Sequence, residues 1–441
     1  MRFLLIALAG FLTLSTVFGI DPGPAPGLKI KNALLYMIVM TLALRVTLDR
    51  TYRIQLPAVP VIFAVLIGYA VLTYVVIVFA LNYPPHYDWL TNGMNLKNSL
   101  FDQMMLFLVF FYGLRTNEDG VVVLKVLVAC WVLSHLAAVM DAVGIMHVGD
   151  IRERPDGRVQ GAVGESNQYG AFVAMSLPAT AVLIMVTRGF WRLFWLGAAA
   201  VCAVALVMTV SRGAFVGTTV AAVTALYLFR RQITAGKVLA YVGGFVAIAT
   251  LAVTAAAALG WGDLLLSRLL GGARMGGDLE GISSGRLQVW TTAIEVMWEH
   301  PITLLTGYGW AAYATMPFRL ATHNHYLAHW FNLGVIGLTC AVLLFVVPIR
   351  YARSAALRAS PEVRPLLIGF VVASLAIATS VFFVDLYLPW LYYWSYAGVI
   401  MRLAVNANEG VPAWSAVPAA AGSSVARRRS DAHGWTAAQS R

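Results

Sequence analysis

The sequence has little charge for its length. Of its 441 residues, 12% are Asp, Glu, Lys or Arg, whereas 60% are hydrophobic. Soluble domains usually carry about 25% charged residues. Apolar runs recur along most of the chain, and about 20 apolar residues are enough for one helix to cross a bilayer. The composition therefore excludes a water-soluble globular protein and predicts an all-α, polytopic transmembrane bundle.

Cysteines and clustered carboxylates are also scarce, which argues against a metal site. The three cysteines, Cys130, Cys202 and Cys340, are scattered within apolar runs, where a cysteine usually serves as a small core residue. Few carboxylates lie near the polar motifs of the chain, so an acidic metal-binding loop is not expected. We predict no metal and no cofactor.

The chain also lacks a concentrated basic patch, although its formal net charge is +11. The basic residues are spread among short loops and the C-terminal tail, without the aromatic interleaving that a nucleic-acid surface shows. Nucleic acid is therefore not an expected partner. Membrane topology explains these charges better.

About twelve membrane spans are predicted, with one long hydrophilic insert between the ninth and tenth. The first is expected to be an anchor and not a signal peptide, because its apolar core is long and no small-x-small cleavage site follows. The spans lie near 3–20, 32–48, 58–81, 100–114, 121–146, 168–187, 190–209, 213–229, 238–260, 324–349, 366–384 and 387–404. Residues 1–405 form the transmembrane domain with the insert at 261–322, and 406–441 are an expected disordered cytoplasmic tail.

The loop charges predict the orientation. With the N-terminus in the cytoplasm, 20 of the 31 basic residues fall on the cytoplasmic side, as the positive-inside rule requires. Both termini are then cytoplasmic and the insert lies outside. Since no soluble domain is present, any active site must be built at that outer face.

Several arginines contradict the rule, because this topology places Arg158, Arg212, Arg286 and Arg319 outside. An anionic ligand at the membrane surface would account for them, and contacts with lipid head groups are the alternative. Arg212 lies between two apolar runs with almost no loop, so its permanent charge needs a partner close to hydrocarbon. The adjacent Gly213 permits another helix or a ligand to approach the backbone.

The insert contains a predicted amphipathic helix within GISSGRLQVWTTAIEVMWEHP, capped by Ser283 or Ser284. Its apolar stripe consists of Leu287, Trp290, Ile294 and Met297. Arg286 falls in the first turn, where a guanidinium and free backbone N–H groups would together hold an anion. A helix lying on the bilayer with an incidental arginine is the alternative.

Polar residues gather in two further stretches. RPDGRVQGAVGESNQYG contains Arg158 and Asn167, which could hold a sugar or a diphosphate, although a well-turned loop explains much of its composition. HNHYL places His323, Asn324 and His325 at the mouth of the tenth span. A neutral histidine there can accept a proton from a sugar hydroxyl, whereas His329, further along, is expected to be a core histidine.

Together these motifs resemble the O-antigen ligase and polysaccharide polymerase family of bacterial inner-membrane glycan transferases. The likeness covers roughly residues 150–345. Its motifs are the stretch from Arg158 to Asn167, SRGA after a span, Gly-Arg-x-x-x-Trp, HPITLLTGYGW, and HNHYL followed by NLGVIGL. Two features depart from the family pattern: HNHY has two histidines where one is expected, and extra residues separate His-Pro from Gly-x-Gly.

The resemblance implies an inverting, metal-independent transfer of a glycan from undecaprenyl diphosphate to an acceptor hydroxyl at the periplasmic face. Carried over by motif, Arg212 and Arg286 would hold the diphosphate leaving group, and His323 would activate or orient the acceptor. Arg158, Asn167, His325, Asn324 and Arg319 are expected to bind substrate.

The motifs leave the acceptor open: it could be lipid A core, a growing glycan or a protein. Specificity is expected in the segments 82–99 and 261–282. A polysaccharide or lipid-linked glycan transporter, or flippase, is the competing hypothesis, although the chain has no evident internal repeat. A non-catalytic subunit of an export machine, whose arginines bind only membrane lipids, is a third.

Overall fold

The computed structural model of the chain describes most of the bundle and parts of the insert. The described residues are 1–17, 29–48, 58–80, 87–145, 158–230, 236, 243–244, 247, 250, 253–254, 257–262, 285–316, 322–386 and 389–409. The predicted tail at 406–441 and the first part of the insert therefore fall largely outside them. Arg319 also lies outside the described residues.

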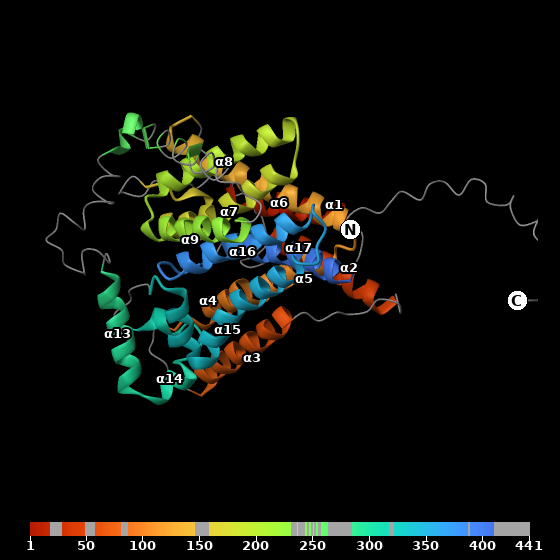
Figure 1. Cartoon of the computed structure of the whole chain (residues 1–441). Coiled ribbons are helices and arrows are strands. Elements are labelled where there is room, and N and C mark those ends of the chain that lie inside the picture. The colour runs from red at the N-terminus through yellow and green to blue at the C-terminus, as the bar shows by residue number, and fades with distance from the viewer. Residues whose placement is uncertain are drawn as a thin grey trace, which may run out of the picture.

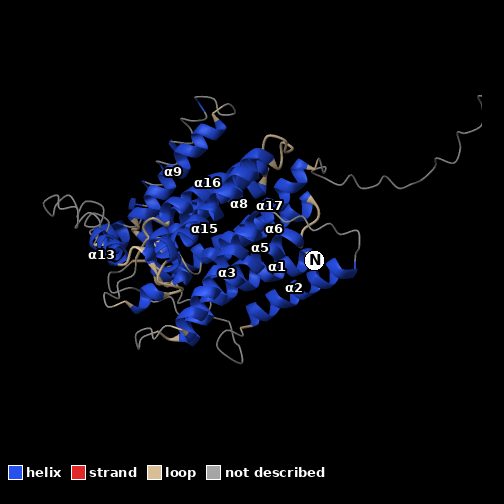
Figure 2. Cartoon of the chain, turned by 90° about the horizontal axis from the view of Figure 1, so that it is seen from below, coloured by secondary structure: helices blue, strands red, loops and turns tan. Residues whose placement is uncertain are grey.

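Every regular element in the described part of the chain is a helix (Figures 1 and 2). The α-helices are α1 (Arg2–Val17), α2 (Ile30–Leu48), α3 (Ala58–Phe79), α4 (Trp89–Leu96), α5 (Asp102–Tyr112), α6 (Asn117–Ala142), α7 (Ser166–Val186), α8 (Phe190–Thr209), α9 (Arg212–Phe229), α13 (Arg286–Glu299), α14 (Ile302–Thr306), α15 (His325–Ala355), α16 (Arg364–Ser380) and α17 (Pro389–Asn408). Two π-helical segments, Lys97–Phe101 and Ala257–Trp261, and two 3₁₀ turns, Gly161–Val163 and Ala312–Thr315, complete the set. The predicted all-α class is confirmed.

Seven of the described helices are long and apolar enough to cross a membrane, and α1 and α16 are shorter apolar helices. The chain is thus a polytopic membrane bundle. Of the predicted spans, only 238–260 has no described helix over most of its length, because most of its residues lie outside the described part. The count of twelve remains a prediction.

The core of the bundle is formed by α16 and α17, which lie between two groups of helices. In Figure 1, α6 to α9 lie above them and α3, α4 and α15 lie below. Almost every residue of α17 is buried. Its aromatic side chains interlock with the neighbours: Trp394 packs edge-on against Phe63, with ring centroids 4.7 Å apart, and stacks on Trp390 at 5.8 Å. Offset and edge-on ring pairs of this kind stabilise a core beyond the area that they bury.

One predicted loop is helical instead. Residues 82–99 were expected to form a specificity loop, but α4 begins at Trp89 and continues through the π-helical segment into α5. Asp88 caps the start of α4, since its side chain accepts from the backbone N–H groups of Leu90 and Thr91. A carboxylate at an N-cap satisfies orphan donors and interacts favourably with the helix dipole. The result is a helix that enters the bundle well before the predicted span at 100–114.

Contacts between chain ends define one end of the bundle, here called the terminal end. Arg2 donates to Asp119 at the start of α6 (3.1 Å). Asn406, near the end of α17, donates to the carbonyl of Arg115 (3.2 Å). Arg358, after α15, donates to the Asn408 side chain (3.2 Å). The opposite end, the site end, holds the start of α15, the α8–α9 turn and the turn between α16 and α17.

Candidate functional site

The α8–α9 turn presents Arg212 at the site end. Val210 adopts a left-handed conformation (φ 47°) and ends α8, and Ser211 caps α9 by accepting from the Ala214 N–H. Only two residues therefore separate the helices, and Arg212 is the first residue of α9. Placing a permanently charged guanidinium here is costly unless negative charge or hydrogen bonds surround it.

Gly213 and Ser380 bring this turn against the end of α16. A Cβ on Gly213 would lie 2.7 Å from the Cβ of Phe383, and the Ser380 hydroxyl lies 3.4 Å from the Gly213 carbonyl that it donates to. The predicted close approach at Gly213 is confirmed, and its partner is the segment that follows α16. We call that segment, residues 381–386, the α16–α17 turn.

Arg158 and Asn167 form a polar cluster on the end of α8. Arg158 is 6% exposed, and its guanidinium donates to the Thr209 carbonyl (3.0 Å) and to Asn167 Oδ1 (2.9 Å). Asn167 Nδ2 in turn donates to Glu165 (2.9 Å), which caps α7. The predicted pair is therefore brought together, and Glu165 adds a negative charge beside it.

Arg286 is the first residue of α13, and its charge interacts with that of Arg212. Burial lowers the pKa of Arg286, the positive charge of Arg212 lowers it further, and the negative charge of Glu165 raises it. The two guanidinium groups and Glu165 therefore lie close enough to interact. The expected serine cap is not seen: Gly285, with φ 78°, is the N-cap and provides no side-chain hydrogen bond, while Ser283 and Ser284 lie outside the described residues.

The insert helix α13 is held on the bundle by its apolar face. Ala293 and Met297 are fully buried against Phe331 of α15. The indole N–H of Trp290 donates to the Thr322 carbonyl (2.8 Å). Leu287, predicted on the same stripe, is instead 37% exposed. The helix thus packs on the protein itself, and Trp290 in its second turn is held at Thr322.

Asp385, in the α16–α17 turn, anchors the histidine motif. Its Oδ2 accepts from the Thr322 hydroxyl (2.6 Å) and from the backbone N–H of His323 (3.0 Å). His323 has φ 48°, a strained conformation for a non-glycine residue that is concentrated at functional sites. Asp385 Oδ1 is buried and has no hydrogen-bond partner within the described residues. Burial raises the pKa of Asp385, opposed by the Thr322 hydrogen bond and the charge of His323.

Sequence reasoning missed Asp385. The available signal was a lone acidic residue between two apolar runs, in FFVDLYLPW. Such a residue indicates only a span boundary, because isolated charges commonly mark the ends of membrane helices. The fold is needed to show that this boundary meets the histidine motif, about 60 residues earlier in the chain.

Asn324 and His325 begin α15. Asn324 Oδ1 accepts from the N–H groups of Tyr326 and Leu327 at 3.1 Å each, so this oxygen caps the helix. His325 is 9% exposed, and its ring lies 5.0 Å from that of Trp390 and 4.1 Å from that of His329. His329, expected in the core, is hydrogen-bonded to the His325 carbonyl (2.9 Å).

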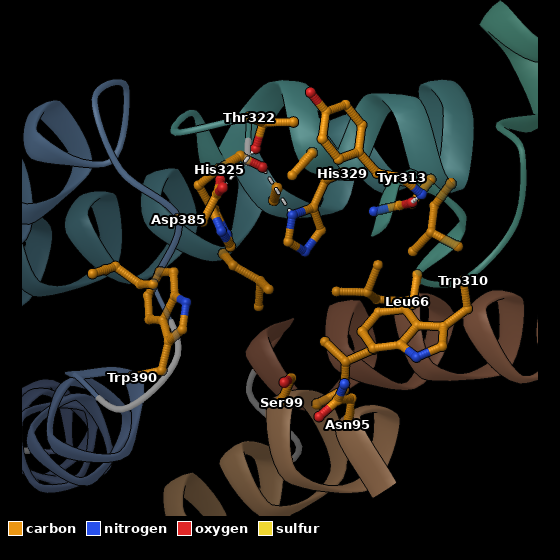
Figure 3. Close-up of a pocket in the computed structure, with 18 of the residues that line it drawn as sticks. Leu66, Asn95, Ser99, Trp310, Tyr313, Thr322, His325, His329, Asp385 and Trp390 are labelled. Atoms are coloured by element: carbon orange, nitrogen blue, oxygen red, sulfur yellow. Dashed lines mark hydrogen bonds between the residues drawn. The ribbon is translucent and has the colours of Figure 1, made fainter. Parts of the chain in front are cut away.

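Asp385 also lines a cavity of ≈ 370 Å³ (Figure 3). The cavity is lined by α3, α4, the π-helical segment Lys97–Phe101, α15, the α16–α17 turn, α17 and residues 310–314. Its lining includes Leu66, Asn95, Ser99, Trp310, Tyr313, Thr322, His325, His329, Asp385 and Trp390. Arg158, Arg212, Arg286 and His323 are not among the lining residues, whereas Thr322 and Asp385 are, and Asp385 accepts from the His323 N–H.

Residues 197–342 match the sequence model of a protein family described as O-antigen ligase. The matched segment includes Arg212, Arg286 and His323, whereas Arg158, Asn167 and Asp385 lie outside it. A search of curated proteins finds no match to this chain. Over these residues, about a third of the chain, the family match confirms the resemblance drawn from the motifs and implies an enzyme of the glycan-transferring class.

Proposed function

We propose that this chain, which carries the O-antigen ligase domain, transfers a glycan from undecaprenyl diphosphate to an acceptor hydroxyl with inversion and without a metal ion. One observation carries the proposal: residues distant in sequence converge on the α16–α17 turn. Gly213 packs on Phe383, Trp290 is tied to Thr322, and Asp385 holds His323. On the basis of these contacts the proposal puts Arg212, the start of α13 and the histidine motif around one point.

In the proposed reaction, Arg212 and Arg286 bind the diphosphate. Two guanidinium groups near each other repel, and Glu165 offsets only part of their charge. A diphosphate would supply the rest, and the positive end of the α13 helix dipole would attract it further. As the bond to the anomeric carbon breaks, negative charge grows on the leaving phosphate. Fixed cations in a partly dry site stabilise that charge without reorganising.

His323 would accept the proton of the acceptor hydroxyl. The acceptor oxygen then forms the new bond to the anomeric carbon, while the electron pair of the old carbon–oxygen bond leaves with the lipid diphosphate. Asp385 would hold the His323 backbone in its left-handed conformation, and its charge would favour the protonated imidazole that results. The division of labour resembles other general-base sites in which a carboxylate orients a histidine.

The remaining predicted residues would support the donor. Arg158, bonded to Asn167, would hold the loop that carries Glu165 beside the arginines. Active-site access from the periplasm of a bacterial inner membrane follows if the terminal end is cytoplasmic, as the loop charges predict.

The direct test is transfer by the purified full-length protein in detergent. Undecaprenyl-diphosphate-linked glycan and candidate acceptors would be supplied, and released lipid diphosphate and the new glycosidic bond would both be measured. Arg212→Ala and Arg286→Ala should each lower kcat by about 10²- to 10³-fold, as loss of a charge-stabilising donor does. Arg192→Ala, an exposed arginine at the start of α8, is the matched control and should retain full activity.

His323→Gly separates chemistry from folding. Glycine accepts the left-handed conformation without strain, so this variant should be at least as stable as the wild type while losing about 10²- to 10⁴-fold in rate. Added imidazole should restore part of that rate. Full activity of any of the three site variants would refute the role assigned to that residue. In proteoliposomes, movement of lipid-linked glycan across the bilayer without release of lipid diphosphate would identify a transporter instead.

A further inference from the structure

The cavity beyond Asp385 has an unusual wall, built from α4 and the π-helical segment Lys97–Phe101. Asn92, Asn95 and Ser99 line it, and their spacing places them on one face of a continuous helix. Across the cavity stand His325 and His329 (Figure 3). π-Helical turns are rare and are often found at functional sites.

From this arrangement we infer that the cavity is the acceptor subsite and that it receives an uncharged hexose at the end of a glycan. This inference rests on the proposed function and extends it by naming the class of acceptor. It favours a glycan acceptor over a protein side chain and over an anionic sugar.

The lining combines one polar wall with a larger apolar part, which includes Phe63, Leu66 and Leu344. Amide and hydroxyl groups from Asn92, Asn95 and Ser99 offer donors and acceptors to several hydroxyls. Trp310 and Trp390 offer aromatic surface for the C–H face of a pyranose. The volume, ≈ 370 Å³, falls within the range of about 300–1,000 Å³ that is typical of small-ligand pockets.

Three hydrogen bonds fix the position of Trp310 in the cavity lining before any ligand binds. Its indole N–H donates to the Asn92 carbonyl (2.9 Å), and its backbone N–H donates to Thr73 (3.2 Å). Tyr87 donates to its carbonyl (2.8 Å). A preorganised aromatic surface loses little entropy on binding.

The charge of the lining selects against anions. Among the described residues that line the cavity there is no lysine or arginine, and Asp385 is the carboxylate. An anionic sugar would meet this carboxylate without a compensating cation, whereas a neutral hydroxyl can donate to its Oδ1. That oxygen is buried without a hydrogen-bond partner in the described part of the chain, which is costly unless a ligand or water supplies a donor.

The acceptor and the donor would bind in different parts of the site. The arginines and His323 do not line the cavity, whereas Thr322 and Asp385, which hold the His323 backbone at its edge, do. A diphosphate on the arginine side and a hydroxyl entering from the cavity side would approach the anomeric carbon from opposite faces. Inversion requires that arrangement.

The π-helical segment is itself held in place from outside the cavity. The Lys97 ammonium lies 2.9 Å from Asp102 Oδ2, and the Tyr36 hydroxyl of α2 donates to the other oxygen of Asp102. This ion pair spans the ends of the segment and fixes the register that turns Ser99 into the cavity.

Binding can be measured without any transfer. Saturation-transfer NMR on the full chain in detergent would use methyl α- and β-glycosides of glucose, galactose and mannose as neutral probes, and methyl glucuronide as the anionic probe. At least one neutral hexoside should show saturation transfer several-fold stronger than the glucuronide. Asn95→Leu and Ser99→Val should reduce that signal at least fivefold, with the protein still folded by thermal unfolding.

Asn98→Leu is the matched control, because Asn98 lies in the same helical stretch, is exposed and does not line the cavity; its signal should equal that of the wild type. Equal binding by the cavity variants, or glucuronide binding as strong as that of the hexosides, would overturn the inference. Sugar binding in a protein without transfer activity would count against the proposed function alone. Transfer with an unchanged acceptor KM in Asn95→Leu would count against the acceptor subsite alone.

Discussion

At the scale of single residues, the site contains groups whose backbone conformation or burial is energetically unfavourable. His323 occupies a left-handed backbone conformation, and Asp385 has a buried oxygen without a partner in the described structure. Each costs free energy that surrounding contacts must offset. Such costs persist where a function depends on the geometry, since ordinary packing would remove them.

Asp385→Asn should therefore reduce activity without reducing stability. Burial raises the pKa of Asp385, so the folded protein binds a proton here more readily than the unfolded chain. The stabilisation from this group is then present below its unfolded pKa, about 3.9, and is lost as the pH rises through the folded pKa. At pH 7 the charged form destabilises the fold, and asparagine removes that charge.

The expected result is an unfolding temperature at pH 7 equal to or above that of the wild type, with transfer slowed by about 10²-fold or more. The gap in unfolding temperature should narrow toward pH 4, as the wild-type carboxyl takes up its proton. Thermal unfolding in detergent across this pH range measures it. A variant less stable than the wild type at pH 7 would mean that Asp385 is chiefly a structural ion.

At the scale of elements, α9 depends on two glycines to reach α16. A Cβ on Gly213 would press on Phe383, and one on Gly217 would lie 2.5 Å from the Ala376 carbonyl oxygen. The spacing of four residues is the small-xxx-small pattern by which membrane helices bring their backbones together. Because Arg212 precedes this contact directly, the packing of α9 on α16 also sets the position of the guanidinium.

Gly217→Ala should accordingly destabilise the protein by about 1–3 kcal/mol, the usual cost of overpacking, and lower transfer as Arg212 is displaced. Gly197→Ala in α8 is the control, since nothing lies within 4 Å of the added Cβ. That substitution should be neutral or stabilise by about 0.5–1 kcal/mol, because alanine favours helix over glycine. Denaturation of the two variants in the same detergent compares them directly. Equal stability would show that the α9–α16 contact is loose.

Elements were predictable where hydrophobicity alone defines them. The long apolar helices, such as α3 and α15, follow from uninterrupted runs. The helix from Trp89 to Phe101 was missed because Asn92, Asn95 and Asn98 give it the composition of a loop. Two of these asparagines face the cavity, and a polar residue facing an internal cavity cannot be distinguished by sequence from one facing water.

The same limit applies to the site. Arg212 and Arg286 could be singled out because cations outside the membrane oppose the positive-inside rule. Their proximity could not be predicted, because it depends on α9 and α13 both meeting the residues around Thr322 and the α16–α17 turn. Asp385 lies in this α16–α17 turn, and the sequence around it contains no recognisable motif.

At the scale of the whole molecule, the two ends of the bundle differ in the contacts that their polar and charged residues make. The terminal end joins α1, α6, α15 and α17 through Arg2, Asn406 and Arg358. At the site end, Gly213, which follows Arg212, packs on Phe383 of the α16–α17 turn. The structure therefore places the start of α1 and the end of α17 at the same end, as an even number of spans requires.

We predict that the terminal end is cytoplasmic, because positive charge is retained on the side from which membrane helices insert. Single cysteines would be introduced after replacing Cys130, Cys202 and Cys340, which are buried or half-buried. Ser354→Cys, exposed near Arg358, should be protected from a membrane-impermeant maleimide in spheroplasts and should react after lysis. Thr291→Cys, exposed on α13, should react in both. The reverse pattern would put the arginine cluster and the cavity in the cytoplasm, where a periplasmic acceptor glycan could not reach them.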